Sequence, residues 1–184
     1  MHFSTGTAFA YPPGLIKMMF HINDGNKEIR RWPAGNGSKN MKIATRDFGE
    51  MEIDPKEVVE FLSPIYGFEN LKRFVLLYDD NIPPFTWLQS IEEPQICFIM
   101  VDPAVAARNY APQLPEDAKK LLQIEKTEDV VWRALTVIPH NFAESTMNLK
   151  SPIIINPANK CAAQIILEAD YPFKAPLMGE DKSC

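Results

Sequence analysis

Thr146 to Leu167, TMNLKSPIIINPANKCAAQIIL, carries the strongest structural signal in this chain of 184 residues. Met147–Leu149 has the composition of a short strand, and Pro152 lets the chain bend before Ile153–Ile155 resumes the strand. Asn156–Lys160 follows as a turn, because Asn-Pro initiates turns and Asn tolerates positive φ. Cys161–Leu167 then returns as a second strand. We therefore predict a β-hairpin whose arms are largely buried.

Strand patterns extend outward from this hairpin over most of the chain. Met41–Thr45 and Glu50–Ile53 flank a turn at Asp47–Gly49, and their apolar residues alternate as in a half-solvated antiparallel pair. Four further runs are apolar or β-branched and end at turn residues. They are Phe74–Tyr78, Phe85–Ser90, Ile96–Val101 and Val130–Ile138.

Two short helices interrupt the strands. Asp54 has the position of an N-cap with Pro55 in the first helical position, and Pro64 limits the length of that helix. The spacing of Ala118, Leu121 and Leu122 predicts a second helix over 115–123. About eight short strands without a βαβ rhythm indicate a mainly β fold, an antiparallel-rich, barrel-like single domain.

The ends of the chain differ from this domain, which spans residues 41–177. Residues 1–40 are rich in Pro and Gly, at Tyr11–Gly14 and Trp32–Ser38, so we expect a poorly structured extension. Two interpretations stay open: a genuine appendage, or a non-native upstream start with Met41 as the natural beginning. Residues 178–184 are expected to form a frayed tail.

Composition excludes several classes of protein. No apolar run approaches the roughly 18 residues of a membrane span, and no secretion signal is recognisable at the N-terminus. Three widely spaced cysteines argue against a disulfide framework, which favours a cytoplasmic location. We expect no membrane association, and an acidic monomer is the simplest expectation.

Charge is unevenly distributed along the chain. Residues 1–40 hold five Lys or Arg against two acids, which leaves 14 basic and 22 acidic residues, a balance of −8, for residues 41–184. Because residues 41–184 are this acidic, they repel the phosphate backbone of nucleic acids, and we expect no direct nucleic-acid binding. It favours a basic protein partner through electrostatic steering, although an acidic surface can also serve solubility alone.

Catalytic and metal-binding patterns are weak. The three histidines stand in no HxH, HExxH or CxxC arrangement, so we expect no metal and no cofactor. Cys161 with His140 is the one conceivable nucleophile and base, but Lys160 is the only basic neighbour that would lower the pKa of the thiol. Trp87 and Trp132 are expected in the core.

A collinear series of motifs resembles the flagellar assembly factor FliW family. Two departures stand out: Pro64 replaces a glycine of the family pattern, and Tyr66 stands where a proline is common. Residues 1–40 have no counterpart. The motifs are Met41–Ile43, Asp47–Glu50, Tyr66–Glu69, Leu71, Arg73–Leu76, Trp87–Ser90, Asp102-Pro103, Tyr110, Val137–Pro139, Met147–Leu149, Pro152–Pro157, Gln164, Tyr171-Pro172 and Pro176-Leu177.

The resemblance implies a non-enzymatic regulator that binds flagellin and also the translational regulator CsrA, a small basic RNA-binding dimer. Flagellin that accumulates would take the regulator away from CsrA, and CsrA would again repress flagellin synthesis. Acidic and aromatic positions near loops are the candidate contacts for these partners. They are Tyr66, Phe68, Glu69, Asp79, Asp80, Phe85, Glu92 and Glu93.

Two other functions stay open at this point. A β-barrel of this kind could bind a small molecule or a peptide in its mouth, if the barrel holds an apolar cavity with convergent polar groups. The alternative is a cysteine hydrolase built on Cys161 and His140.

Overall fold

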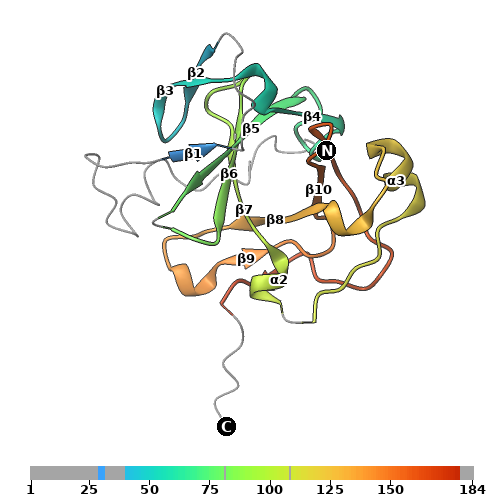
Figure 1. Cartoon of the computed structure of the whole chain (residues 1–184). Helices are drawn as coiled ribbons and strands as arrows, with labels where there is room; N and C mark the ends of the chain where they lie inside the picture. Colours follow the sequence, from blue (N-terminus) through green and yellow to red (C-terminus); the bar gives the residue numbers. More distant parts are fainter. Residues whose placement is uncertain (1–28, 32–39, 81, 108, 179–184) are drawn as a thin grey trace, which may run out of the picture.

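Seven strands close a barrel at the centre of the protein (Figure 1). The computed structural model describes residues 29–31, 40–80, 82–107 and 109–178. Around the barrel the order is β11-β4-β5-β6-β7-β8-β10, and a pairing of β10 with β11 completes the circle. The strands are β4 (Val58–Ser63), β5 (Arg73–Asp79), β6 (Phe85–Ser90), β7 (Cys97–Val101), β8 (Val131–Val137), β10 (Ile153–Asn156) and β11 (Cys161–Gln164).

The pairings around the barrel are antiparallel with one exception. β11 runs parallel to β4, with a register shift between Ala162 and Ala163. The mainly β, barrel-like prediction is therefore confirmed, and the barrel is closed because the β10–β11 hairpin pairs with β4 on one side and with β8 on the other. The predicted strands at 74–78, 85–90, 96–101 and 130–138 correspond to β5, β6, β7 and β8.

One hydrophobic cluster fills the barrel, and all seven strands contribute side chains to it. Phe74 of β5 lies near its centre, with its ring 5.0 Å from that of Phe61 and 6.2 Å from that of Phe98. The buried members are Val59, Phe61, Ile65, Phe74, Leu76, Leu88, Phe98, Met100, Ile153, Ile155 and Ala162, with Val131 and Leu135 of β8 packed against them.

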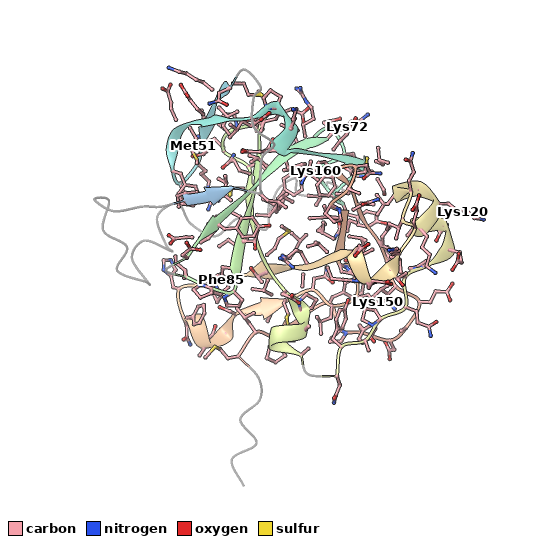
Figure 2. The ribbon with its side chains drawn as sticks, in the orientation of Figure 1. Met51, Lys72, Phe85, Lys120, Lys150 and Lys160 are labelled. Carbon is pink, nitrogen blue, oxygen red and sulfur yellow. The ribbon has the colours of Figure 1, made fainter. Side chains whose placement is uncertain are left out.

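Two covers pack on the outside of the barrel. The hairpin of β2 (Met41–Thr45) and β3 (Gly49–Ile53) has the predicted turn and pairs Ile43 with Met51. Its Phe48 meets the buried Trp87 edge-on at 5.5 Å, so Trp87 is a core residue as predicted. Helix α3 (Glu116–Leu122), also predicted, covers β10 and β11, where Leu122 forms a buried cluster with Ile154 and Ala163. Trp132 is half-buried and packs against this cluster. In Figure 2, Met51 of the hairpin and Lys120 of α3 lie on opposite sides of the barrel.

The central hairpin is confirmed, with arms shorter than predicted. β10 pairs with β11 from Ile153↔Gln164 to Asn156↔Cys161, and Lys160 takes a left-handed φ of 60° in the turn. The Asn156 amide Nδ2 donates to the carbonyls of Leu122 and Gln123 at 2.8 and 3.1 Å, which anchors the end of α3.

The segment before β10 forms a separate small pairing. β9 (Thr146–Met147) pairs with the end of β8 and with β12 (Ala175–Pro176). Beyond Gln164 the second arm leaves the sheet, so Ile166 is 52% exposed.

The predicted helix after Asp54 is wrong. Asp54 does cap a turn, since its Oδ1 accepts from the Lys56 amide at 2.9 Å, but only the 3-10 turn η1 (Pro55–Glu57) forms. Val58–Ser63 then becomes β4, because Val59 and Phe61 alternate into the barrel and pairing with β5 outweighs the local helix signal. The same Asp-Pro signature at Asp102 begins α2 (Pro103–Ala106), a helix that was not predicted.

The other described turns are η2 (Thr127–Asp129) and η3 (Phe142–Glu144). Most of the predicted extension 1–40 lies outside the described residues, as does the tail from residue 179. Within the extension Ile29–Arg31 forms strand β1, which pairs antiparallel with β5. In the part of the chain that the structure describes, no helix is long and apolar enough to cross a membrane.

Candidate functional site

An apolar groove of about 330 Å³ opens at one mouth of the barrel. Its floor is formed by Phe98 and Ile65 of the interior cluster and by Phe68 and Leu135 packed against that cluster. Ile65 and Phe98 are only 1% and 3% exposed, so the groove ends on the packed core of the barrel. We call this the mouth groove; the residues that line it are Ile65, Tyr66, Phe68, Phe98, Leu135, Val137, Thr146, Asn148, Ser151, Gln164, Ile166, Phe173 and Lys174.

Exposed apolar side chains gather around the mouth groove. Seven large hydrophobic residues are exposed among the described residues, and four of them line this groove. Their exposed fractions are 52% for Tyr66, 39% for Val137, 52% for Ile166 and 60% for Phe173. Single exposed hydrophobic residues are normal on protein surfaces, but exposed apolar residues that gather in one place often mark a binding site.

A buried hydrogen-bond network holds one wall of the mouth groove. The Gln164 side chain accepts from the Tyr66 amide at 2.9 Å and donates to the carbonyl and hydroxyl oxygens of Ser151 at 3.1 and 3.3 Å. Asn148 in turn donates to the Ser151 hydroxyl at 2.7 Å and accepts from the Ser151 amide at 2.9 Å. Three segments that are distant in sequence are thereby fixed to one another.

The loop that carries Tyr66 is shaped by local chemistry. Gly67 has φ +85°, a conformation that side-chain-bearing residues rarely adopt, so this position favours glycine. The Gly67 amide donates to the Glu69 carboxylate at 2.8 Å, and this bond holds the pKa of Glu69 below its ordinary value. Phe68 turns inward and meets Phe98 edge-on at 4.9 Å.

Three of the eight predicted contact residues therefore share one place. Tyr66 and Phe68 line the mouth groove, and Glu69 stands on the same loop, exposed. The structure does not bring the other five to this groove.

Two of those five residues are buried, against the expectation of exposed loop positions. Phe85, labelled in Figure 2, is only 7% exposed, because it begins β6 and packs in a buried cluster with Ile53 and Trp87. Its ring lies 6.3 Å from that of Phe142. Asp79 is 4% exposed and ends β5 rather than beginning a loop. Asp80, the next residue, is exposed.

Glu92 and Glu93 lie on the turn between β6 and β7. The Glu92 carboxylate accepts from the amides of Lys72 and Arg73 at 2.7 and 3.0 Å and pairs with the Arg73 guanidinium at 3.3 Å. Partial burial opposes ionisation, but these bonds together hold the pKa of Glu92 below its ordinary value. Glu92 therefore joins the start of β5 to this turn, and both acids of the pair are exposed.

The cysteine hydrolase alternative finds no support in the geometry. Burial and the nearby Glu60 carboxylate raise the pKa of the Cys161 thiol, so the sulfur is protonated at neutral pH, the opposite of an activated nucleophile. His140 is exposed after the end of β8. Across the described residues, no group of three or more His, Cys, Asp or Glu side chains could hold a metal ion.

Sequence reasoning missed most of the rim of the mouth groove. Val137 lies in a predicted strand, Ile166 in the predicted second arm of the hairpin, and Phe173 in the extended stretch that closes the predicted domain, so none was singled out. Pro139 is a local signal near the rim, since it follows the end of β8 two residues after Val137.

Comparison with known proteins identifies relatives over nearly the whole barrel. The model of the family described as FliW protein matches residues 42–177. Flagellar assembly factor FliW of Caldanaerobacter subterraneus subsp. tengcongensis is 38% identical over 145 residues, 78% of this chain and 97% of that protein. The protein of the same name from Thermoanaerobacter pseudethanolicus is 39% identical with the same coverage. A crystal structure of the flagellar assembly factor FliW superimposes with a TM-score of 0.72 at 34% identity, over 77% of this chain and 99% of that one.

Proposed function

Because the chain belongs to the FliW family of flagellar assembly factors, we propose that it is a non-enzymatic regulator that binds flagellin and CsrA in exchange. In this scheme CsrA held by the protein cannot repress flagellin translation. Flagellin that accumulates binds the protein and releases CsrA. Such an exchange is a linked equilibrium, and it requires that each partner disfavour the complex with the other.

The mouth groove is the observation that carries this proposal. Its rim offers two exposed aromatic and two exposed aliphatic side chains around a concave apolar floor, as in the buried centre of a protein interface. A volume of about 330 Å³ suits a few apolar side chains of a partner rather than a whole helix. We assign this groove to flagellin.

CsrA is assigned to a different kind of surface. The exposed carboxylates of Glu69 and Glu93 lie on the connections before β5 and after β6, and the exposed Asp80 lies at the other end of these two strands. Residues 41–184 as a whole carry 22 acidic against 14 basic groups. A small basic dimer is attracted to such a surface. Since Glu69 adjoins Tyr66 and Phe68, a partner at either surface can disturb the other, which supports exchange.

The test is calorimetric titration of the full chain with flagellin and, separately, with CsrA. Binding to both, with flagellin abolishing the heat of the CsrA titration, is the expected result. The proposal would be overturned if the folded protein gave no heat with either partner and a second method, such as gel filtration, also detected no complex. We place the protein in the cytoplasm as a monomer, and gel filtration of the free chain also tests the latter.

A matched pair of variants locates the flagellin site. Phe173→Ser removes the most exposed ring of the groove and is expected to weaken flagellin binding at least about tenfold. Leu121→Ser is the control, because Leu121 is also exposed, at 40%, but lies on α3 and does not line the groove. Equal effects of the two substitutions would argue against the groove.

A second candidate function, binding of a small molecule or peptide in the barrel mouth, is favoured by the same cavity. Asn148, Ser151 and Gln164 are polar groups that converge on an apolar floor. Their hydrogen bonds, however, run largely among themselves and to the backbone, which leaves an apolar ligand as the better fit. Native mass spectrometry of the purified protein tests this, since a bound compound would add a discrete mass that Phe173→Ser removes.

A further inference from the structure

Strand β5 has an edge that its barrel neighbour leaves uncovered. β4 pairs with β5 only between Val58–Glu60 and Arg73–Val75, because the chain before Val58 is the η1 turn. The remaining half of β5, Leu77–Asp79, carries β1 on that side, with Ile29 opposite Asp79 and Arg31 opposite Leu77 (Figure 1). We call Leu77–Asp79 the β5 edge.

The backbone alternation of β5 shows which groups this edge offers. The Lys72 carbonyl accepts from Phe61 on the β4 side at 2.7 Å, and the Arg73 carbonyl accepts from Ile91 on the β6 side at 3.1 Å. Because successive residues of a strand face opposite neighbours, the amide and carbonyl of Tyr78 face β1. Tyr78 is the residue paired with Arg30, so this pair is the centre of the added strand.

The barrel lies within the part of the chain that matches the family, but β1 lies outside it. The family match begins at residue 42, and β1 ends at Arg31, whereas β5 and β6 lie inside the match. Without β1, the Tyr78 amide and carbonyl on this side of β5 would have no neighbouring strand, and such an edge accepts an extended segment by strand addition.

The sequence around the β5 edge defines the occupant. β1 reads Ile-Arg-Arg within Lys27–Arg31, a basic stretch of an extension whose balance is +3. Its Ile29 end meets Asp79, next to the exposed Asp80, in a body whose balance is −8. Arg30 and Arg31 pair with Tyr78 and Leu77 rather than with an acid, so backbone pairing selects an extended strand and the −8 balance of the body favours a basic one.

We propose that the β5 edge is a strand-addition site for an extended basic segment of a partner protein, and that β1 is a built-in competitor that keeps the site closed. None of Leu77–Asp79 lines the mouth groove, so this site is separate from the one assigned to flagellin. Tethering gives β1 an effective concentration in the millimolar range. A free segment therefore binds with an affinity reduced by the small fraction of molecules in which the edge is open.

The experiment uses the full chain and a labelled peptide with the sequence of residues 25–33, GNKEIRRWP. Arg30→Pro removes the amide that faces Tyr78, so β1 should leave the edge. We expect hydrogen exchange of the Tyr78 amide to accelerate at least about tenfold and affinity for the peptide to rise by a similar factor. Arg30→Glu with Arg31→Glu keeps the amides and should open the edge through charge alone.

Matched peptides separate strand addition from simple charge attraction. A peptide with proline at the Arg30 position keeps most of the charge but cannot pair, so it should not bind either chain. A peptide with both arginines replaced by glutamate should also fail. The proposal is overturned if Tyr78 exchange is unchanged in Arg30→Pro, or if the proline peptide binds as well as the parent. Phe173→Ser, a change in the mouth groove, should leave peptide binding unaltered, whatever the outcome of the flagellin titration.

Discussion

At the scale of single residues, Gln164 is the side chain on which the mouth groove most depends. It is 4% exposed, lies at the end of β11, and ties the Tyr66 loop to the bend at Ser151. A buried amide is costly unless its partners are present, and the partners of Gln164, which are Tyr66 and Ser151, both belong to the wall of the groove. The residue thus links the closed barrel to the shape of its mouth.

Replacing Gln164 with Met keeps the volume but removes the bonds. The Tyr66 amide and the Ser151 carbonyl lose their partner, so we expect a loss of about 2 kcal/mol in the free energy of unfolding. Urea denaturation measures this loss, and flagellin affinity should fall with it. Gln95→Met is the control, since Gln95 is exposed and should change stability by less than about 0.5 kcal/mol.

Gly67 allows a cleaner test, because its cost is purely conformational. No atom lies within 4 Å of where a Cβ would stand, so the φ of +85° alone opposes a side chain. Gly67→Ala should cost about 1 kcal/mol in thermal or urea unfolding. Gly67→Asn should cost less, because Asn adopts left-handed conformations more readily. Equal losses for the two variants would show that the strain lies elsewhere.

At the scale of elements, local signals were reliable where two neighbouring strands share a turn and unreliable where a distant strand decides. Both predicted hairpins formed with their expected turns. Asp54 and Asp102 carry the same cap signature, but only the second begins an α-helix. The difference is tertiary: Val58–Ser63 must supply one wall of the barrel.

The Glu92 clamp between the start of β5 and the β6–β7 turn predicts a dependence of stability on pH. The folded-state pKa of Glu92 is depressed below 4.5, so its contribution is present above that pH and is lost as the pH falls through the folded-state value. We expect Glu92→Gln to be less stable than the parent at pH 7 and to approach it in acid. Denaturation from pH 7 to pH 3 measures this, with Glu93→Gln as control. Parallel curves for parent and Glu92→Gln would contradict the assignment.

At the scale of the whole molecule, the protein is a closed barrel with an acidic body and one apolar mouth. The proposed partners use these two properties separately. Salt screens attraction between exposed charges and leaves burial of apolar surface largely intact, so the two complexes should respond differently to ionic strength.

Titrations at increasing NaCl concentration test this division. Between 50 mM and 500 mM, CsrA affinity should fall by roughly tenfold or more, whereas flagellin affinity should change by less than about threefold. The double variant Asp80→Asn with Glu93→Gln should flatten the salt dependence for CsrA and leave flagellin unaffected. If the affinity for CsrA did not depend on salt, the proposal that CsrA binds the acidic surface would be wrong.

The sequence by itself determined the mainly β class, the central hairpin, most of the strands and, through its motifs, the family. These features follow from turn chemistry and from alternation along one strand, which are local. Only the tertiary structure decided that β11 lies parallel to β4 and closes the barrel, and that Phe85 and Asp79 are buried. It also decided the mouth groove, because Tyr66, Val137, Ile166 and Phe173 come from four separate segments. Their convergence depends on closure of the sheet, a long-range pairing that no local pattern encodes.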